Sequence, residues 1–152
     1  MIEIIRTDST NNDFVRLVTL LDADLKIRDG EDHIFYSQFN KIENIKNALV
    51  AYKDKKAIAC GAFKPFSENS VEIKRMFVLN DLRNQGIAQQ VLFELEKWAS
   101  ELKYQSCVLE TGKNQPEAIR LYEKSGYKSI PNYGQYANIE NSVCMKKDLE
   151  TT

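Results

Sequence analysis

Apolar residues that alternate or recur at helical spacing predict the elements of the first half of the chain. An apolar run predicts a strand at about 2–7. Between 13 and 26 apolar residues recur at helical spacing, so a helix is expected there, capped by Asn12 or Asp13. A second, short helix is predicted at 42–48. Three strands should follow, at about 48–53, 56–64 and 70–79.

The strongest helical pattern in the chain covers 86–102. Its apolar residues form one stripe, and charged residues such as Glu96 are expected mostly off that stripe. A short strand at 106–110 comes next, and then a helix at 116–124 that begins on proline and is followed by glycine. Two last strands are predicted near 126–130 and 139–147.

This order of elements predicts the fold class. Strands come first as a meander and then alternate with helices, which is typical of an α/β (α+β) fold with a mixed sheet covered by helices on its faces. No repeat or Pro/Gly-rich linker divides the 152 residues, so a single domain over 1–152 is expected. Hydrophobic residues make up 43% and charged residues 28%, a composition typical of soluble globular proteins.

Charge and composition argue against several kinds of partner. The formal net charge of −1 argues against broad attraction to nucleic acid or to anionic membranes. The chain has no transmembrane-length apolar run and no secretory signal pattern at its start, so a cytoplasmic location is expected. Cys60, Cys107 and Cys144 lie far apart and are expected to be buried thiols, and His33 is the single histidine. No metal site is therefore predicted.

The six residues from Arg83 to Ala88 join the strand at 70–79 to the long helix. The first turn of a helix has N–H groups without intrahelical partners and a partial positive charge, and both attract phosphate oxygens. Gly86 lets the backbone approach a phosphate and adopt a positive φ, the small Ala88 keeps the approach open, and Arg83 adds a cation. The segment predicts a phosphate-binding turn, although a plain helix N-terminus with a glycine near its cap explains the same residues.

Two longer segments carry a family resemblance. KRMFVLNDLRNQGIAQQVLFELEKWA resembles motif A of the GNAT N-acetyltransferase superfamily, in which a strand leads through Arg/Gln-x-x-Gly-x-Gly/Ala into an amphipathic helix. VLETGKNQPEAIRLYEKSGY resembles motif B, a strand ending in a carboxylate before a helix that closes with Leu-Tyr-Glu-x-x-Gly-Phe/Tyr. The motifs stand in the order and at the separation of that superfamily and cover residues 70–130. In the tail, the stretch IPNYGQY…SVCMKK further resembles a bacterial GNAT subgroup of unassigned acceptor.

The resemblance implies a GNAT fold with a mostly antiparallel sheet that splays open at the slot for acetyl-CoA, the acetyl donor. The main chain of Met76, Phe77 and Val78 would pair with the pantetheine arm, and an N–H near Phe77 or Val78 would stabilise the tetrahedral oxyanion. An amide of Asn114 or Gln115 would contact CoA, because asparagine stands one residue earlier here than in the motif. The pyrophosphate would bind the turn residues Arg83, Asn84, Gln85, Gly86, Ile87 and Ala88.

The resemblance also implies three catalytic candidates. Tyr122 matches the motif B tyrosine that donates a proton, or only a hydrogen bond, to the CoA thiolate; packing of the ring is the alternative. Glu72 holds the general-base position of several GNAT enzymes, and Glu110 matches the corresponding position of others that modify protein N-termini. Strand alternation would place Glu72 on one face with Lys74 and Met76. Which carboxylate acts, or whether a water relays the proton, stays open.

Acidic and aromatic residues are frequent in the segments that border the acceptor site of a GNAT fold. Such groups suit a cationic amine. We expect acetyl transfer to a primary amine of a small molecule or peptide; the alternative is a catalytically weak CoA-binding regulatory module. A homodimer is left open. The residues in question are Asp22, Asp24, Glu31, Asp32, Phe35, Tyr36, Tyr133 and Tyr136.

Overall fold

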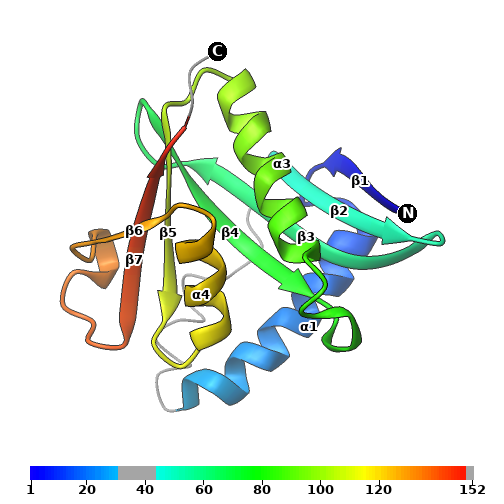
Figure 1. Cartoon of the computed structure of the whole chain (residues 1–152), viewed down its shortest axis with the longest axis horizontal. Coiled ribbons are helices and arrows are strands. Elements are labelled where there is room, and N and C mark those ends of the chain that lie inside the picture. The colour runs from blue at the N-terminus through cyan, green and yellow to red at the C-terminus, as the bar shows by residue number, and fades with distance from the viewer. Residues whose placement is uncertain (31–43, 150–152) are drawn as a thin grey trace.

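Seven strands form one sheet in the order β1-β2-β3-β4-β5-β7-β6 (Figure 1). The computed structural model describes residues 1–30 and 44–149. The strands are β1 Ile2–Thr7, β2 Asn47–Lys53, β3 Lys56–Pro65, β4 Ser70–Val78, β5 Ser106–Gly112, β6 Lys128–Ile130 and β7 Ser142–Asp148. The α-helices are α1 Asn12–Asp29, α3 Ile87–Glu101 and α4 Pro116–Lys124, and the 3-10 helices are η2 Asn80–Leu82 and η3 Gly134–Tyr136. Among the described strands all neighbours are antiparallel except β4 and β5, so the predicted mixed α/β fold is confirmed.

The short helix predicted at 42–48 is wrong in the part that the structure describes. Residues 44–46 are irregular and β2 begins at Asn47, whereas 42 and 43 lie outside the described residues. β2 pairs with β1 on one side and β3 on the other, and its residues from Ala48 to Ala51 are fully buried. A central strand buries apolar side chains on both faces, which one stripe of a short helix cannot do.

Two element ends also differ from the prediction. The cap of α1 is Asn11 rather than Asn12 or Asp13, because the Asn11 side chain accepts a hydrogen bond from the N–H of Phe14 at 2.9 Å. The last strand begins at Ser142, since η3 and the turn after it occupy the residues before it.

Helices cover both faces of the sheet, with α3 and α4 on one face and α1 on the other (Figure 1). Buried residues of the central strands divide between two apolar clusters, one containing Leu95 of α3 and the other Phe14 of α1. Helix α3 lies close to β3 at Gly61, where a Cβ would come within 2.9 Å of the Val91 and Leu95 side chains. Only glycine permits that contact without displacing α3.

Glu96 departs from the predicted helix pattern, because it lies on the buried side of α3 and not off the apolar stripe. Its carboxylate accepts a hydrogen bond from the Tyr127 hydroxyl at 2.8 Å and pairs with Lys147 Nζ at 2.8 Å. Both partners come from later in the chain, so hydrophobic spacing along the helix could not reveal them. Paired in this way, a buried carboxylate is tolerated in the core.

A β-bulge interrupts β4 at Arg75 and Met76, which together face the single residue Gly61 of β3. Arg75 has a φ of 62°, a left-handed conformation that is strained for a residue with a side chain. The bulge breaks the alternation of the strand, so Met76 lies on the α3 face beside Gly61 and belongs to the cluster of Leu95. The prediction that Met76 shares a face with Glu72 is therefore wrong.

Strands β4 and β5 pair in parallel over only three residues each, Ser70–Glu72 of β4 with Ser106–Val108 of β5. Beyond this register β4 continues to Val78 and β5 to Gly112 without pairing to each other. The two strands diverge toward their C-terminal ends, with α4 in front of the gap (Figure 1). The splay implied by the resemblance is present.

The described residues contain no helix long and apolar enough to cross a membrane. Within the same part of the chain, no group of three or more His, Cys, Asp or Glu side chains could hold a metal ion. The three cysteines are free and buried, as predicted. The single histidine, His33, lies outside the described residues.

Candidate active site

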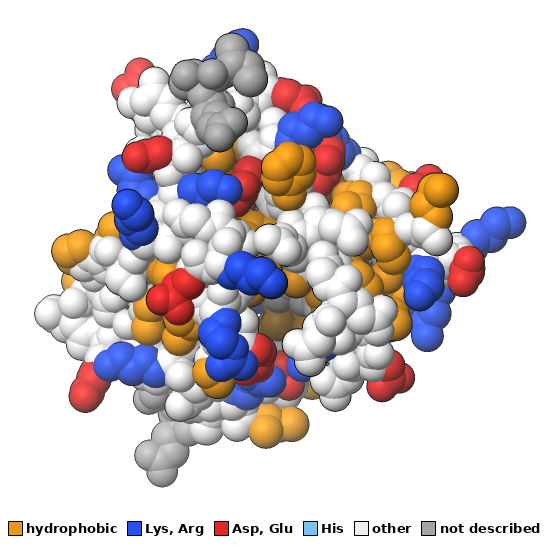
Figure 2. Space-filling view, in the orientation of Figure 1, with side chains coloured by type: hydrophobic (Ala, Val, Ile, Leu, Met, Phe, Trp, Pro, Cys, Tyr) orange, Lys and Arg blue, Asp and Glu red, His pale blue; other side chains and the backbone are white. Residues whose placement is uncertain are grey.

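A cleft of about 830 Å³ lies where β4 and β5 separate. Its walls come from β4, β5, α1, the η2–α3 turn, α4 and η3. Figure 2 shows a hollow at the centre of this face with Lys and Arg side chains around it. Because the splay removes strand pairing here, main-chain groups of β4 and side chains from both sheet faces border one space.

The turn between η2 and α3 forms one end of the cleft. Asn84 has a φ of 65° and Gly86, the N-cap of α3, has a φ of 79°. A Cβ at Gly86 would meet nothing within 4 Å, so the space beside the helix N-terminus is open. The first-turn N–H groups of α3 lie at this end, and the helix dipole adds partial positive charge. This is the geometry that binds phosphate oxygens in other helix N-termini.

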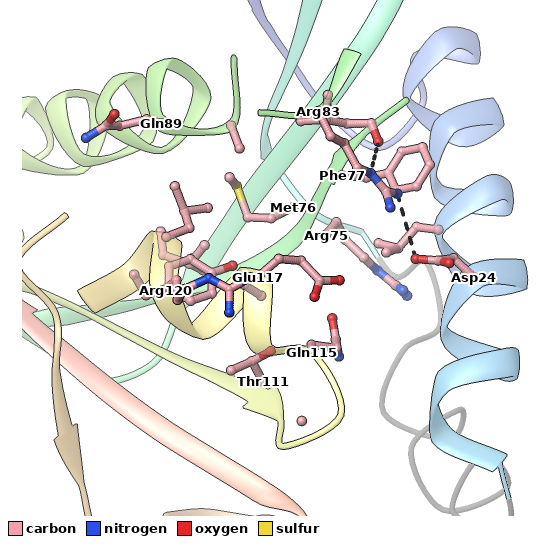
Figure 3. A pocket seen from close by; sticks show the side chains of 18 of the residues that line it. Asp24, Arg75, Met76, Phe77, Arg83, Gln89, Thr111, Gln115, Glu117 and Arg120 are labelled. Carbon is pink, nitrogen blue, oxygen red and sulfur yellow. Dashed lines mark hydrogen bonds and ion pairs between the residues drawn. The ribbon is translucent and has the colours of Figure 1, made fainter. Parts of the chain in front are cut away.

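Arg83 lies across this end of the cleft, turned back toward β4 and α1 (Figure 3). Its Nε donates to the Val78 carbonyl oxygen at 3.0 Å, its Nη2 lies 3.8 Å from Asp24, and its guanidinium stacks 5.5 Å from the Phe77 ring centroid. The guanidinium thus fixes the end of β4 to the turn.

The pairing of β4 with β3 determines which main-chain groups face the cleft. The N–H of Leu79 donates a hydrogen bond to the carbonyl oxygen of Ile58 at 2.9 Å, so Leu79 and Ile58 form a hydrogen-bonded pair. In an antiparallel ladder such pairs alternate with pairs that exchange no hydrogen bonds. Val78 and Ala59, the next pair along, are therefore not hydrogen-bonded to each other. The N–H and C=O of Val78 therefore point away from β3, toward the gap. The Val78 carbonyl oxygen accepts a hydrogen bond from Arg83 Nε, whereas the Val78 N–H faces the cleft.

The two amides at the start of α4 differ in position. Asn114 donates from Nδ2 to the carbonyl oxygen of Arg28 at 3.1 Å, which ties α4 to the end of α1, and Arg28 also pairs with Glu117. Gln115 lines the cleft at the N-cap of α4 (Figure 3). Of the two predicted amide candidates, the structure places Gln115 at the cleft.

Tyr122 lies in α4 and lines the cleft, and its ring packs edge-on to Tyr127 with centroids 5.7 Å apart. Burial and the charge of Glu110 raise the pKa of the Tyr122 hydroxyl well above its ordinary value. The phenol therefore stays protonated, as a hydrogen-bond donor, throughout the neutral and alkaline range in which enzymes work.

Glu72 and Glu110 both line the cleft but have different surroundings. Glu72 is 4% exposed, accepts a hydrogen bond from the Tyr133 hydroxyl at 2.7 Å and lies 3.8 Å from Lys64 Nζ. Glu110 follows the splay on β5, with one carboxylate oxygen shielded from solvent. Burial, and after it the charges of Glu110 and Glu72, also raise the pKa of the Tyr136 hydroxyl. Glu110 therefore interacts electrostatically with both Tyr122 and Tyr136.

Comparison with known proteins assigns the family. The model of the acetyltransferase (GNAT) family matches residues 14–127. The chain belongs to the GNAT family. It is 33% identical over 102 residues to an IAA acetyltransferase of Azospirillum brasilense, covering 66% of this chain and 67% of that protein. It is thus an acetyl-CoA-dependent acyltransferase.

Solved structures share the fold of this GNAT chain over nearly its whole length. A putative acyl-CoA N-acyltransferase from Klebsiella pneumoniae superposes with a TM-score of 0.83 at 28% identity, covering 99% of both chains. The PaiA N-acetyltransferase from Thermoplasma acidophilum, solved in complex with coenzyme A, has a TM-score of 0.72 at 20% identity and covers 97% of this chain and 99% of that one.

Several cleft residues of this GNAT protein were not predicted from the sequence. Arg120 and Lys124, four residues apart on α4, line the cleft and form no ion pair within the described residues. Their i, i+4 spacing could have indicated a cationic helix face. Arg75 could not have been found in this way, because its inward direction depends on the bulge.

The residues expected at the acceptor side are only partly described. Tyr136 lines the cleft, Tyr133 contacts Glu72, and Asp22 and Asp24 form ion pairs with arginines. Those ion pairs weaken the expectation that both aspartates attract an amine. The remaining candidates, Glu31, Asp32, Phe35 and Tyr36, lie outside the described residues.

Proposed function

We propose that the chain transfers an acetyl group from acetyl-CoA to a primary amine by direct attack in a ternary complex. The observation that carries the proposal is the splay after Glu72 and Val108, because one cleft then joins the positive-φ turn at Gly86 to Tyr122. A long, bent cofactor and a separate acceptor can enter such a cleft from opposite faces of the sheet and meet in the gap.

The cofactor would lie along the α3 and α4 side. The turn from Arg83 to Ala88 would bind the pyrophosphate through main-chain N–H groups, and Arg120 and Lys124 would add positive charge nearby. Gln115 rather than Asn114 would supply the amide contact, since Asn114 already bonds to α1. A structural neighbour of the same fold was solved with coenzyme A, which supports this ligand class.

The Val78 N–H would stabilise the oxyanion. The main chain of β4 from Met76 to Val78 borders the gap, where the pantetheine arm would lie like an added strand. The Val78 N–H points into that space from a fixed strand, and Arg83 holds the adjoining carbonyl. A preorganised donor of this kind contributes about 3–4 kcal/mol to transition-state binding.

Glu110 would take the proton of the amine, with Glu72 as the alternative. The apolar strand neighbours of Glu72 and Glu110 belong to the apolar cluster of α3, so alternation turns both carboxylates to the opposite face of the sheet. Of the two, Glu110 is the one whose charge acts on Tyr122. Glu72 already has Tyr133 and Lys64 as partners. An amine near pKa 10.4 is almost fully protonated at neutral pH, so a base is needed before attack.

The reaction balances with these groups. The ammonium group first gives one proton to the carboxylate, and the neutral amine nitrogen then forms a bond to the acetyl carbonyl carbon. The C–S bond breaks to release the CoA thiolate, and the second proton that the nitrogen loses passes to that thiolate or to solvent. Tyr122 would donate a hydrogen bond to that thiolate. Its raised pKa makes complete proton transfer unfavourable, because the thiol is the stronger acid of the two.

Release of free thiol from acetyl-CoA tests the proposal. The panel of acceptors contains polyamines, amino acids, aminoglycosides and peptide N-termini, and CoA affinity is measured in parallel by calorimetry. Thiol release above hydrolysis with at least one amine supports acetyl transfer. CoA binding without release for any acceptor would contradict it and favour the regulatory module. If neither CoA binding nor thiol release is detected, the result would contradict the cofactor site as well.

A further inference from the structure

Arg75 is a buried cation on the α1 side of β4, at the bulge. Its side chain is 2% exposed, yet it lines the cleft. Nη1 lies 3.1 Å from Asp22 Oδ1, whereas Nε and Nη2 are buried and have no hydrogen-bond partner. Figure 3 shows the side chain extending from β4 toward α1, beneath Asp24.

Two nitrogens of one guanidinium without hydrogen-bond partners are unusual in a folded protein. Buried N–H donors are nearly always paired, because an unpaired one loses its water without compensation, at a cost of about 1–3 kcal/mol. Asp22 neutralises part of the charge, but it is 47% exposed and occupies one nitrogen only. Burial lowers the pKa of Arg75 from its ordinary value, and arginine nevertheless stays protonated at neutral pH.

The strained backbone at Arg75 directs this side chain into the cleft. Its φ of 62° belongs to the residue that the bulge adds to β4, and the Arg75 carbonyl accepts from the buried thiol of Cys60 at 3.3 Å. Without the bulge, alternation after Lys74 would turn residue 75 toward α3. The position thus combines strain and buried charge, a pair of features that concentrates at ligand sites.

The groups around Arg75 define what could satisfy its donors. Lys74 lies beside it and has electrostatic contact with Glu72 and Glu110, and Tyr136 interacts with Arg75 and with both carboxylates. The cleft therefore carries negative charge near the carboxylates and unsatisfied positive donors near α1. A ligand with both an amine and an anion is complementary to this arrangement.

We propose that Arg75 binds the carboxylate of the acceptor, so that the acceptor is an amine that also carries a carboxylate, such as a free amino acid or a short peptide. This inference rests on the proposed function. Neighbouring N–H groups of a guanidinium match the two oxygens of a carboxylate, a geometry that the point charge of lysine does not reproduce. Polyamines and aminoglycosides lack that group and would be poor acceptors.

Matched pairs of acceptors test the proposal. Each L-amino acid and a set of dipeptides are compared with the same compound as its C-terminal amide, and kcat/KM is measured from thiol release. The wild type should prefer the best acid over its amide by about 10- to 100-fold, equivalent to one charge-assisted pair. R75Q should reduce this preference at least about tenfold, and R75K should restore only part of it.

The control is R16Q, which removes an arginine of α1 that is 61% exposed and pairs with Asp13. It should keep the wild-type preference. An equal preference in R75Q and wild type would overturn the proposal. A loss of CoA affinity in R75Q, with the acid-to-amide ratio unchanged, would overturn it in favour of a contact between Arg75 and pantetheine.

A binding measurement separates this inference from the proposed function. If no acceptor is acetylated, the acids and amides are titrated by calorimetry into the CoA-bound protein. Preferential binding of the acid that disappears in R75Q supports the carboxylate site even if acetyl transfer fails. Equal binding of acid and amide, or no binding of either, would overturn the carboxylate site while CoA affinity still reports on the cofactor side.

Discussion

The two sides of the cleft are built from different parts of the chain. On the α3 side, one continuous segment from β4 through η2 to Gly86 presents main-chain groups and a helix N-terminus. On the α1 side, the side chains of Glu72, Arg75, Glu110 and Tyr133 come together from β4, β5 and the loop before η3. A site made of main chain depends on a few backbone conformations. A site made of distant side chains depends on each residue and on how strands and helices pack.

The largest effect on activity is expected on the α1 side of the cleft, which is made of side chains. Glu110→Gln should lower kcat by about 10²- to 10⁴-fold, because the amide cannot take the proton of the amine. Glu72→Gln should lower it by only about tenfold, since Glu72 then acts through its contacts with Tyr133 and Lys64. Steady-state kinetics over a range of pH measures both variants. A greater loss in Glu72→Gln would assign the base to Glu72.

On the α3 side of the cleft, Gly86→Val should raise the Kd for CoA by about 100-fold. The reason is that a branched side chain would fill the space beside the N-terminus of α3. The control is Gly134→Val in η3, where φ is 53° and a Cβ also meets nothing within 4 Å. Each variant should lose about 1–2 kcal/mol of unfolding free energy from backbone strain. CoA affinity, measured by calorimetry, should fall only in Gly86→Val. Equal CoA affinities of the two variants would show that the turn at Gly86 does not bind CoA.

In α4, Tyr122→Phe should lower kcat by about 10- to 100-fold, because the variant loses one hydrogen bond to the charged CoA thiolate that leaves. The ring stays packed against Tyr127, so the Kd for CoA should change by less than about threefold. Comparison of kcat with the calorimetric Kd separates the two roles. Equal losses in turnover and affinity would show that Tyr122 only packs.

The smallest effect concerns Tyr133, whose pKa is raised by burial and by the Glu72 charge. In the unfolded chain tyrosine ionises near pH 10, whereas folded Tyr133 keeps its proton, so its contribution to stability is complete below pH 10 and is lost above it. Tyr133→Phe should lower the unfolding free energy by about 1–2 kcal/mol at neutral pH. From about pH 10 to 11 the wild type should lose about 1 kcal/mol more than the variant. Urea unfolding at each pH measures this, and parallel pH dependences would exclude the Tyr133–Glu72 bond.

Local patterns were sufficient for most elements. The spacing along α3 reflects burial of one helix face, which leaves a periodic trace in the sequence, and the proline marks the start of α4. The apolar runs of β3 and β5 reflect strands that are buried on both faces. The prediction at 42–48 was wrong because β2 buries both faces between two strands. A short apolar run has the same composition whether it lies in a helix or in a central strand.

The sequence by itself determined the family, the turn from Arg83 to Ala88 and the position of Tyr122, because each is contained in a contiguous motif. Only the tertiary structure decided that Met76 faces α3, that Gln115 rather than Asn114 lies at the cleft, and that Arg75 is buried with two unsatisfied donors. The physical reason is that a bulge, a strand splay and a helix-to-helix contact arise between segments that are distant in the chain. Such contacts set the direction of a side chain without changing the local pattern around it.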